Sequence, residues 1–284
     1  MTAMIETHPL NRDFVWQPTR GPFRRITETQ ARSYDDNGYF VLERALDAAT
    51  CAQLIAAIDP IEAEIEAMVR ACDGGKMFIA RADEITFSPH LVTRSALLHD
   101  FCAGPLFQDL AHDLIGPDVR LYWDQAVYKK PEVEADFPWH QDNGYTYVEP
   151  QRYLTCWIAL TDATLDNGCP WVVPGALHKR GTLRHWMTDL GWRCLHEVPD
   201  ALPIAVPAGS IVVFSSLTPH RTGPNRTGAT RKAYIVQFAP DGAKIKRRGS
   251  DGVLRDEPCD VEERQFPVLI RGERARAGCW VAGG

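Results

Sequence analysis

Residues 210–239 read SIVVFSSLTPHRTGPNRTGATRKAYIVQFA, and this stretch decides the fold. Its two ends are rich in β-branched and aromatic residues, whereas residues 221–230 are dense in Gly, Pro, Asn and Thr. This composition is typical of two strands joined by turns. His220 lies just beyond the first strand, and Arg231 begins the second strand 11 residues later. A hairpin-like return of that length would bring Arg231 back near His220.

Strand character extends back from this stretch to Val119. The runs VRLYWDQAVYKK, YLTCWIAL and CPWVV are short, rich in β-branched and aromatic residues, and separated by Pro, Gly, Asn and Asp. The preceding part of the chain has helical character instead. A block of helices followed by many short strands predicts a mainly β fold with flanking α structure, built on a β-sandwich or barrel.

The helical part shows its own start and stop residues. Thr27 or Thr29 could cap a helix that runs to Asn37 and stops at Gly38, and Tyr39–Leu42 has strand character. Asp47 opens a longer helical stretch in which Pro60 should cause a kink or a split. A further helix is expected after Gly104-Pro105, ending near Gly116.

We expect one domain, because no long linker divides the helical part from the β part. Its expected segments are an N-terminal arm (1–26), a mostly helical flank (27–117), a β core (118–240) and a C-terminal extension (241–284).

Composition excludes several classes of protein. The net charge of −6 argues against nucleic-acid binding, and no run of 18 apolar residues could span a membrane. The first residues lack the basic and apolar regions of a secretory signal, and the eight cysteines form no CxxC pair. We therefore expect a cytoplasmic protein with reduced thiols.

The segment PWHQDNGY, residues 138–145, raises a question of chemistry. On a strand, residues two apart point to the same face, so His140 and Asp142 would converge on a metal ion, a catalytic dyad or a simple polar patch. A His-x-Asp pair with one distant histidine, here His220, is the ligand set of the 2-His-1-carboxylate facial triad. That triad leaves open positions suited to non-haem Fe(II) oxygen chemistry. With Arg231 also present, the metal site is the favoured interpretation.

Several motifs occur together and in a fixed order. They are YKKP at 128–131, WHQDNGY at 139–145, YLTCWIALTDATLDNGCPWVVPGALHK at 153–179, PAGSIVVFSSLTPHRTGPN at 207–225, and RKAYIVQF from Arg231. The chain resembles the phytanoyl-CoA dioxygenase family of Fe(II)/2-oxoglutarate-dependent oxygenases over about 200 residues, from Gly38 to about Pro240. The resemblance implies a double-stranded β-helix, the cupin-like jelly roll, with helices packed on its major sheet.

The resemblance also implies a site and a reaction. His140, Asp142 and His220 would bind Fe(II), and Arg231 would receive the distal carboxylate of the cosubstrate 2-oxoglutarate. Thr222, Trp157, Gln125 and Lys129 match other positions of the family's cosubstrate pocket, and Arg94 is a candidate for a further basic contact. The implied reaction consumes O2, decarboxylates 2-oxoglutarate to succinate and CO2, and hydroxylates a small-molecule substrate.

Candidate substrate contacts follow from position alone. Asn143 and Tyr145 come directly after Asp142, and the long loop 178–200 carries Trp186 and Trp192, which could form an apolar wall. The basic run Lys244–Arg248 could meet a phosphate or a CoA group, although such runs are more often solvated surface.

Two other functions stay open at this point. One is a jelly-roll metal enzyme that does not use 2-oxoglutarate, and the other is a non-catalytic jelly-roll protein that binds a small molecule. We expect a monomer or a homodimer, and no motif identifies the substrate.

Overall fold

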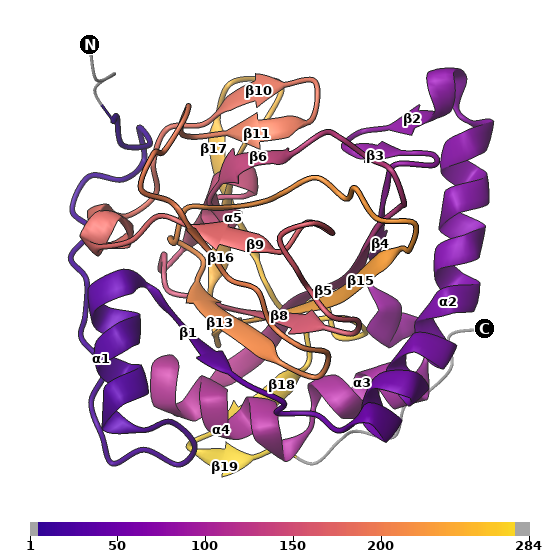
Figure 1. Ribbon diagram of the computed structural model, residues 1–284. Helices are drawn as coiled ribbons and strands as arrows, with labels where there is room; N and C mark the ends of the chain where they lie inside the picture. Colours follow the sequence, from indigo (N-terminus) through magenta and orange to yellow (C-terminus); the bar gives the residue numbers. More distant parts are fainter. Residues whose placement is uncertain (1–4, 276–284) are drawn as a thin grey trace.

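Two antiparallel sheets face each other across a shared apolar core in the computed structural model, which describes residues 5–275 (Figure 1). The larger sheet has the order β1-β13-β8-β15-β5-β4-β3-β2, with β18 and β19 added beside β5. Its strands are β1 (Tyr39–Leu42), β13 (Ile211–Ser215), β8 (Leu154–Ala159), β15 (Arg231–Pro240), β5 (Val119–Lys129), β4 (Ile85–Pro89), β3 (Ala80–Arg81), β2 (Lys76–Met77), β18 (Pro267–Ile270) and β19 (Glu273–Arg274).

The smaller sheet has the order β12-β9-β14-β6. Its strands are β12 (Leu202–Pro203), β9 (Pro170–Val172), β14 (His220–Thr222) and β6 (Phe137–His140). Two minor sheets lie outside this pair. They consist of β10 (Trp186–Thr188) with β11 (Gly191–Arg193), and of β17 (Leu254–Pro258), β16 (Lys244–Arg248) and β7 (Val148–Glu149).

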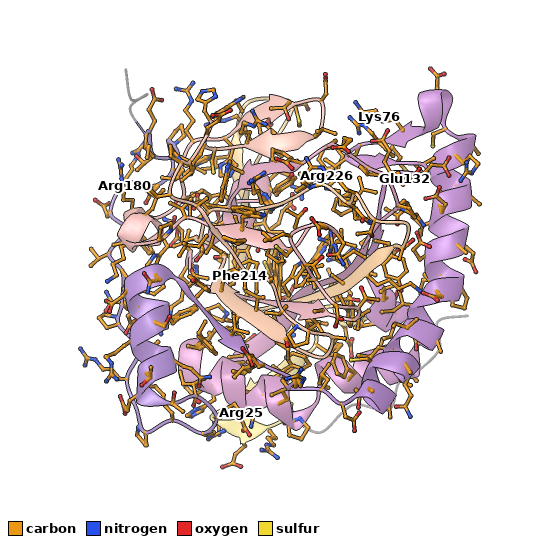
Figure 2. The ribbon with its side chains drawn as sticks, viewed as in Figure 1. Arg25, Lys76, Glu132, Arg180, Phe214 and Arg226 are labelled. Carbon is orange, nitrogen blue, oxygen red and sulfur yellow. The ribbon has the colours of Figure 1, made fainter. Side chains whose placement is uncertain are left out.

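Alternation along the central strands gives the larger sheet two buried faces. On β13, Val212 and Phe214 point into the core between the sheets, whereas Val213 points to the opposite face. On β15, Ile235 points inward and Val236 outward. The label of Phe214 near the middle of Figure 2 marks the inner core. Strands buried on both faces explain the nearly continuous apolar runs in the sequence.

Helices cover the outer face of the larger sheet (Figure 1). They are α1 (Glu28–Asn37), α2 (Ala48–Ala71), α3 (Ala96–Cys102) and α4 (Pro105–Leu114), while the short α5 (Asp142–Tyr145) belongs to the site described below. Three 3-10 turns complete the elements: η1 (Asp73–Gly75), η2 (Leu91–Thr93) and η3 (Ala176–Arg180).

The ends of the first helix are those expected from the sequence. Thr27 and Gln30 form a reciprocal capping box, and Gly38 ends the helix with φ of 79°, a conformation that glycine adopts without steric cost. Asp47 caps α2 through the backbone N–H of Thr50. Of the kink or split expected at Pro60, the split is wrong, because α2 continues through the proline, while the kink stays a prediction. Leu54, Ile58 and Ile61 pack into the core on both sides of the proline, and this burial outweighs the lost backbone hydrogen bond.

Two packed antiparallel sheets with helices on the larger one confirm the predicted jelly roll. The short strands β1, β2, β3 and β4 interrupt the helices within residues 27–117. The single domain and its segment boundaries stay a prediction. Residues 1–4 and 276–284, which include Cys279, lie outside the described part. The other seven cysteines are free thiols. Between residues 5 and 275, no helix has the length and apolar character needed to cross a bilayer.

Candidate metal centre

Strand pairing brings the two candidate imidazoles together. His140 is the last residue of β6 and His220 the first residue of β14, and the two residues are direct register partners. Their ring centroids lie 4.2 Å apart. Asp142 opens α5 immediately after β6, so its carboxylate turns back toward the same point.

The three side chains form a potential metal site. Asp142 Oδ1 lies 3.8 Å from His140 Nε2 and 3.7 Å from His220 Nε2. One ligand atom from each residue lies within 4.8 Å of the others. Both histidines are buried, at 7% and 6% exposure, so few waters compete for these atoms. Two imidazoles and a carboxylate are the donor set of the facial triad.

Backbone carbonyls set the tautomer of each histidine. His140 Nδ1 lies 2.8 Å from the carbonyl of Pro138, and His220 Nδ1 lies 3.0 Å from the carbonyl of Thr218. Donation from Nδ1–H leaves the Nε2 lone pair free for a metal. Burial, followed by the neighbouring His220, holds the pKa of His140 well below its usual value, so this imidazole is neutral near pH 7.

A hydrogen-bond chain orients the carboxylate. Thr155 on β8 donates to Asp142 Oδ2 at 2.6 Å, and Gln237 on β15 donates to the Thr155 hydroxyl at 3.2 Å. Oδ1 is thereby left to face the imidazoles. Sequence reasoning missed Thr155, although a polar residue on the same strand face as Trp157 is a detectable pattern.

The loop that carries Asp142 is held by a third histidine. His185 Nε2 accepts the backbone N–H of Gln141 at 3.0 Å, and the His185 ring lies against Gly144, where an added Cβ would come within 2.0 Å of it. Gly144 is therefore required for close approach. His185, which no sequence motif singles out, therefore supports the metal loop.

The candidate ligands open into a cavity of about 540 Å³ between the two sheets. The lining combines the three ligands with aromatic and aliphatic side chains from both sheets and from the β2–β3 hairpin. Of the residues proposed from the sequence, four line this cavity in addition to the ligands: Thr222, Trp157, Gln125 and Tyr145.

Arg231 is the most unusual residue near the cavity. It is 1% exposed, and its three guanidinium nitrogens have no hydrogen-bond partner in the described part of the chain. Its Cζ lies 5.3 Å from the centroid of the Trp157 ring, which forms part of the cavity wall. Burial lowers the pKa of Arg231 to about 10, so the side chain stays charged near neutral pH.

Lys129 is the register partner of Arg231 on β5, so two basic side chains start from adjacent points on one face. Its Nζ donates to the carbonyls of Ala135, at 2.7 Å, and Gly223. Burial, followed by Arg231, lowers the pKa of Lys129 to about 7. The lysine is therefore satisfied by the backbone, whereas the arginine lacks an anion. A carboxylate is the natural partner of an unpaired buried guanidinium, so this region fits the cosubstrate that the sequence suggested.

Three other candidates do not reach the cavity. Asn143 is buried, and its amide donates to Thr182 Oγ1 at 2.6 Å and accepts from the N–H of Val148 at 3.0 Å. Trp186 on β10 is 36% exposed and makes a tilted ring contact with His196, and neither Trp186 nor Trp192 is part of the lining.

Arg94, the candidate for a further basic contact, pairs with Glu64 at 2.5 Å on the surface and does not line the cavity. The side chains of the β2–β3 hairpin, which sequence reasoning did not identify, occupy the cavity mouth instead. Their run KMFIA after Gly74-Gly75 carries a short apolar strand pattern that could have identified them.

Comparison with known proteins agrees with this architecture. The family model described as phytanoyl-CoA dioxygenase (PhyH) matches residues 34–233. A phytanoyl-CoA dioxygenase of Arabidopsis thaliana is 32% identical over 155 residues, covering 52% of this chain and 54% of that protein. The match thus spans about half the length of this relative.

A second relative and a solved structure match over greater lengths. The phytanoyl-CoA dioxygenase domain-containing protein 1 of Bos taurus is 25% identical over 293 residues, covering 86% of this chain and 98% of that protein. The structure of EctD from S. alaskensis with 2-oxoglutarate and 5-hydroxyectoine superposes with a TM-score of 0.67 at 20% identity, covering 97% of this chain and 96% of that one. On the extent of the family match, this chain belongs to the phytanoyl-CoA dioxygenase family.

Proposed function

We propose that this protein is an Fe(II)- and 2-oxoglutarate-dependent dioxygenase that hydroxylates a small organic molecule. The observation that carries the proposal is the unpaired, buried Arg231 beside a cavity that also holds a His-Asp-His ligand set. Family membership supports the same chemistry. The related structure named with 2-oxoglutarate and 5-hydroxyectoine is a precedent for this fold.

The residues have distinct tasks in this proposal. His140, Asp142 and His220 would hold the iron, with Nε2 and Oδ1 presented by the hydrogen bonds already described. Arg231 would bind the distal carboxylate of 2-oxoglutarate as a fork of donors, with Thr222 and Gln125 as neutral neighbours. When bound, iron with its cosubstrate supplies the oxidising chemistry. The overall reaction converts 2-oxoglutarate, O2 and the substrate to succinate, CO2 and the hydroxylated substrate.

The protein also shapes the surroundings of the reaction. Phe137, Phe214 and Ile235 form apolar walls around the ligands, so bulk water is kept from the reacting groups. The neutral His140 imidazole allows metal binding at that nitrogen without prior proton release.

The proposal is tested by iron binding and by turnover of 2-oxoglutarate. The full chain should bind one Fe(II) under anaerobic conditions and release labelled CO2 from 2-oxoglutarate in air. Asp142→Ala should abolish both while keeping the fold, because the ligand set loses its only anion. His196→Ala is the matched control, since this histidine is exposed, makes a tilted ring contact with Trp186 and does not line the cavity.

The outcomes separate the alternatives. Iron binding without CO2 release from 2-oxoglutarate would favour a jelly-roll metal enzyme with another cosubstrate. Binding of small molecules without any iron dependence would favour a non-catalytic binding protein. Wild-type turnover in Asp142→Ala would remove the assignment of the metal ligands.

A further inference from the structure

The cavity wall beyond the metal ligands is almost free of charge. Among the described residues that line it, Asp142 is the sole acidic side chain, and no lysine or arginine contributes. The lining also includes the apolar side chains of Ile79, Ala80, Ile85, Phe87, Trp123 and Val127. A phosphate, carboxylate or ammonium group placed against this wall would lose its hydration without gaining a partner.

Three basic side chains lie near the cavity, and none of them lines it. Lys129 donates to two backbone carbonyls, and Arg231 is assigned to the cosubstrate by the proposed function. Arg81 on β3 donates to the carbonyl of Asp189 in the β10–β11 turn, while its buried Nη1 has no hydrogen-bond partner among the described residues. An anionic group in the cavity would therefore meet no basic side chain on the lining itself.

The basic run on β16, which could have met a phosphate or a CoA group, has partners of its own. Lys246 pairs with Asp256 at 2.8 Å, and Arg247 pairs with Glu257 at 3.2 Å. Both acids lie on the neighbouring strand β17, and no residue of β16 lines the cavity. The basic run on β16 therefore offers no built site for a CoA moiety beside the cavity.

The cavity mouth is formed by exposed apolar side chains at the tip of the β2–β3 hairpin. Met77 and Phe78 line the cavity while being 36% and 61% exposed. Phe78 has φ of 52°, a left-handed conformation that is costly for a bulky side chain and ordinarily taken by Gly or Asn. An exposed phenylalanine at a strained turn position contributes little to folding, so a role toward a ligand explains it better.

A second hairpin closes the same region. A Cβ on Gly191 of β11 would lie 2.6 Å from the Tyr145 hydroxyl and 3.1 Å from Ile79 Cγ2, so β11 passes directly against both residues. Figure 1 shows β10–β11 and β2–β3 on the same side of the molecule as β6, and Lys76, labelled in Figure 2, marks the start of β2. Neutral polar side chains of the lining on this side include Tyr145 and Thr146.

We propose that the substrate is an uncharged, largely apolar small molecule that enters past Met77 and Phe78 and packs against Phe87 and Trp123. This inference rests on the proposed function, because that function assigns Arg231 to the cosubstrate. A few hydroxyl or carbonyl groups on the substrate suit the neutral polar side chains. The hairpin residues determine specificity, in place of the loop tryptophans expected from the sequence.

Two fluorescent probes that share one ring skeleton test directly whether the cavity prefers an uncharged ligand. N-phenyl-1-naphthylamine is neutral, and 8-anilino-1-naphthalenesulfonate adds one negative charge. The full-length, iron-free protein with saturating 2-oxoglutarate should bind the neutral probe at least about tenfold more tightly than the sulfonate. Phe87→Lys should weaken neutral-probe binding about tenfold and strengthen sulfonate binding, because the ammonium supplies the missing counter-charge.

Two further variants make the result specific to this cavity. Met77→Lys lies at an exposed position that tolerates the change, and it should shift the two probes in the same directions by a smaller factor, even if Phe87→Lys fails to fold. Val15→Lys is the control: Val15 is 69% exposed and lines a separate cavity beside the N-terminal arm. It should leave both affinities unchanged.

The outcomes also separate this inference from the proposed function. Equal or tighter binding of the sulfonate by the wild type, absence of neutral-probe binding, or loss of that binding only in Val15→Lys would overturn the inference. Iron binding and CO2 release from 2-oxoglutarate are measured independently of the probes. A protein that passes those assays but rejects the neutral probe keeps its proposed function and loses its proposed substrate class.

Discussion

The two faces of the larger sheet differ in how their buried polar side chains are paired. On the outer face, Tyr234 donates to Asp124 Oδ2 at 3.0 Å, and Cys102 Sγ lies 3.2 Å from the Tyr234 hydroxyl. On the inner face, one residue further along β5, the Gln125 side chain has no hydrogen bond within residues 5–275, and Arg231, three residues before Tyr234 on β15, has three unpaired nitrogens. The outer face leaves one carboxylate oxygen, Asp124 Oδ1, without a partner, whereas the inner face leaves a whole buried cation without one.

This contrast has an energetic meaning. A buried guanidinium without an acceptor costs free energy that folding alone does not recover. The outer face carries no such unpaired cation, because its polar groups lie against helices and bond to one another. The same strands pair most polar groups on the outer face but leave Arg231 unpaired on the inner face. An anionic ligand best explains this unpaired cation.

The largest effect should follow from removing that cation. Arg231→Ala should raise the apparent KM for 2-oxoglutarate by at least about tenfold, because the distal carboxylate loses its charged partner. Without 2-oxoglutarate, the variant should lose little stability to thermal unfolding, since an unpaired buried charge has been removed. Steady-state CO2 release against 2-oxoglutarate concentration gives KM, and calorimetry gives the midpoint of unfolding.

The matched control for this change is Arg226→Ala. Arg226 lies in the turn before β15, is labelled in Figure 2, and pairs with Glu134 at the surface at 3.1 Å. Its loss should leave KM unaltered. If Arg231→Ala behaved like Arg226→Ala, the inner face would have no demand for an anion and the contrast between the faces would fail.

A smaller effect is expected from the hydrogen bond that orients Asp142. Thr155→Val keeps the shape of the side chain but removes the donor to Oδ2, so Fe(II) should bind about tenfold more weakly. Thr161→Val is the control, because the Thr161 hydroxyl accepts the N–H of Lys232 and contacts no ligand. Anaerobic iron titration measures both variants, and equal affinities would show that Oδ2 needs no partner.

The motifs could be read from the sequence because local geometry determines them. His140 and Asp142 are neighbours in the chain, and pairing of β6 with β14 requires only that His220 begins the next strand of that sheet. The jelly roll was predictable for a similar reason, since its strands are buried on both faces and read as apolar runs.

The substrate side of the cavity was not predictable in this way. Whether Asn143 faces a substrate depends on Thr182 and Val148, which compete for its amide from other loops. Trp186 and Trp192 were placed at the mouth on loop length alone, whereas that place is taken by Met77 and Phe78, from a hairpin more than 100 residues earlier. These contacts depend on how hairpins distant in sequence meet, and no local pattern encodes that.

The smallest effect concerns the outer face and tests whether its polar network is complete in every charge state. Asp124 is fully buried, its Oδ1 has no hydrogen-bond partner, and burial raises its pKa to about 7 against the favourable bonds that Tyr234 and Val92 donate to it. Between the usual pKa of 3.8 and this value, the unfolded chain releases a proton that the folded chain retains. Rising pH therefore favours unfolding across this window, by at most about 1.4 kcal/mol per pH unit, and the effect levels off above the folded pKa.

The Asp124→Asn side chain is neutral at every pH, so the unfolding free energy of this variant should lack this slope between about pH 4 and 7. Denaturant melts of both proteins across that range measure the difference. Parallel curves would mean that the outer face tolerates a carboxylate as well as a carboxylic acid, and the contrast with the inner face would then rest on Arg231 alone.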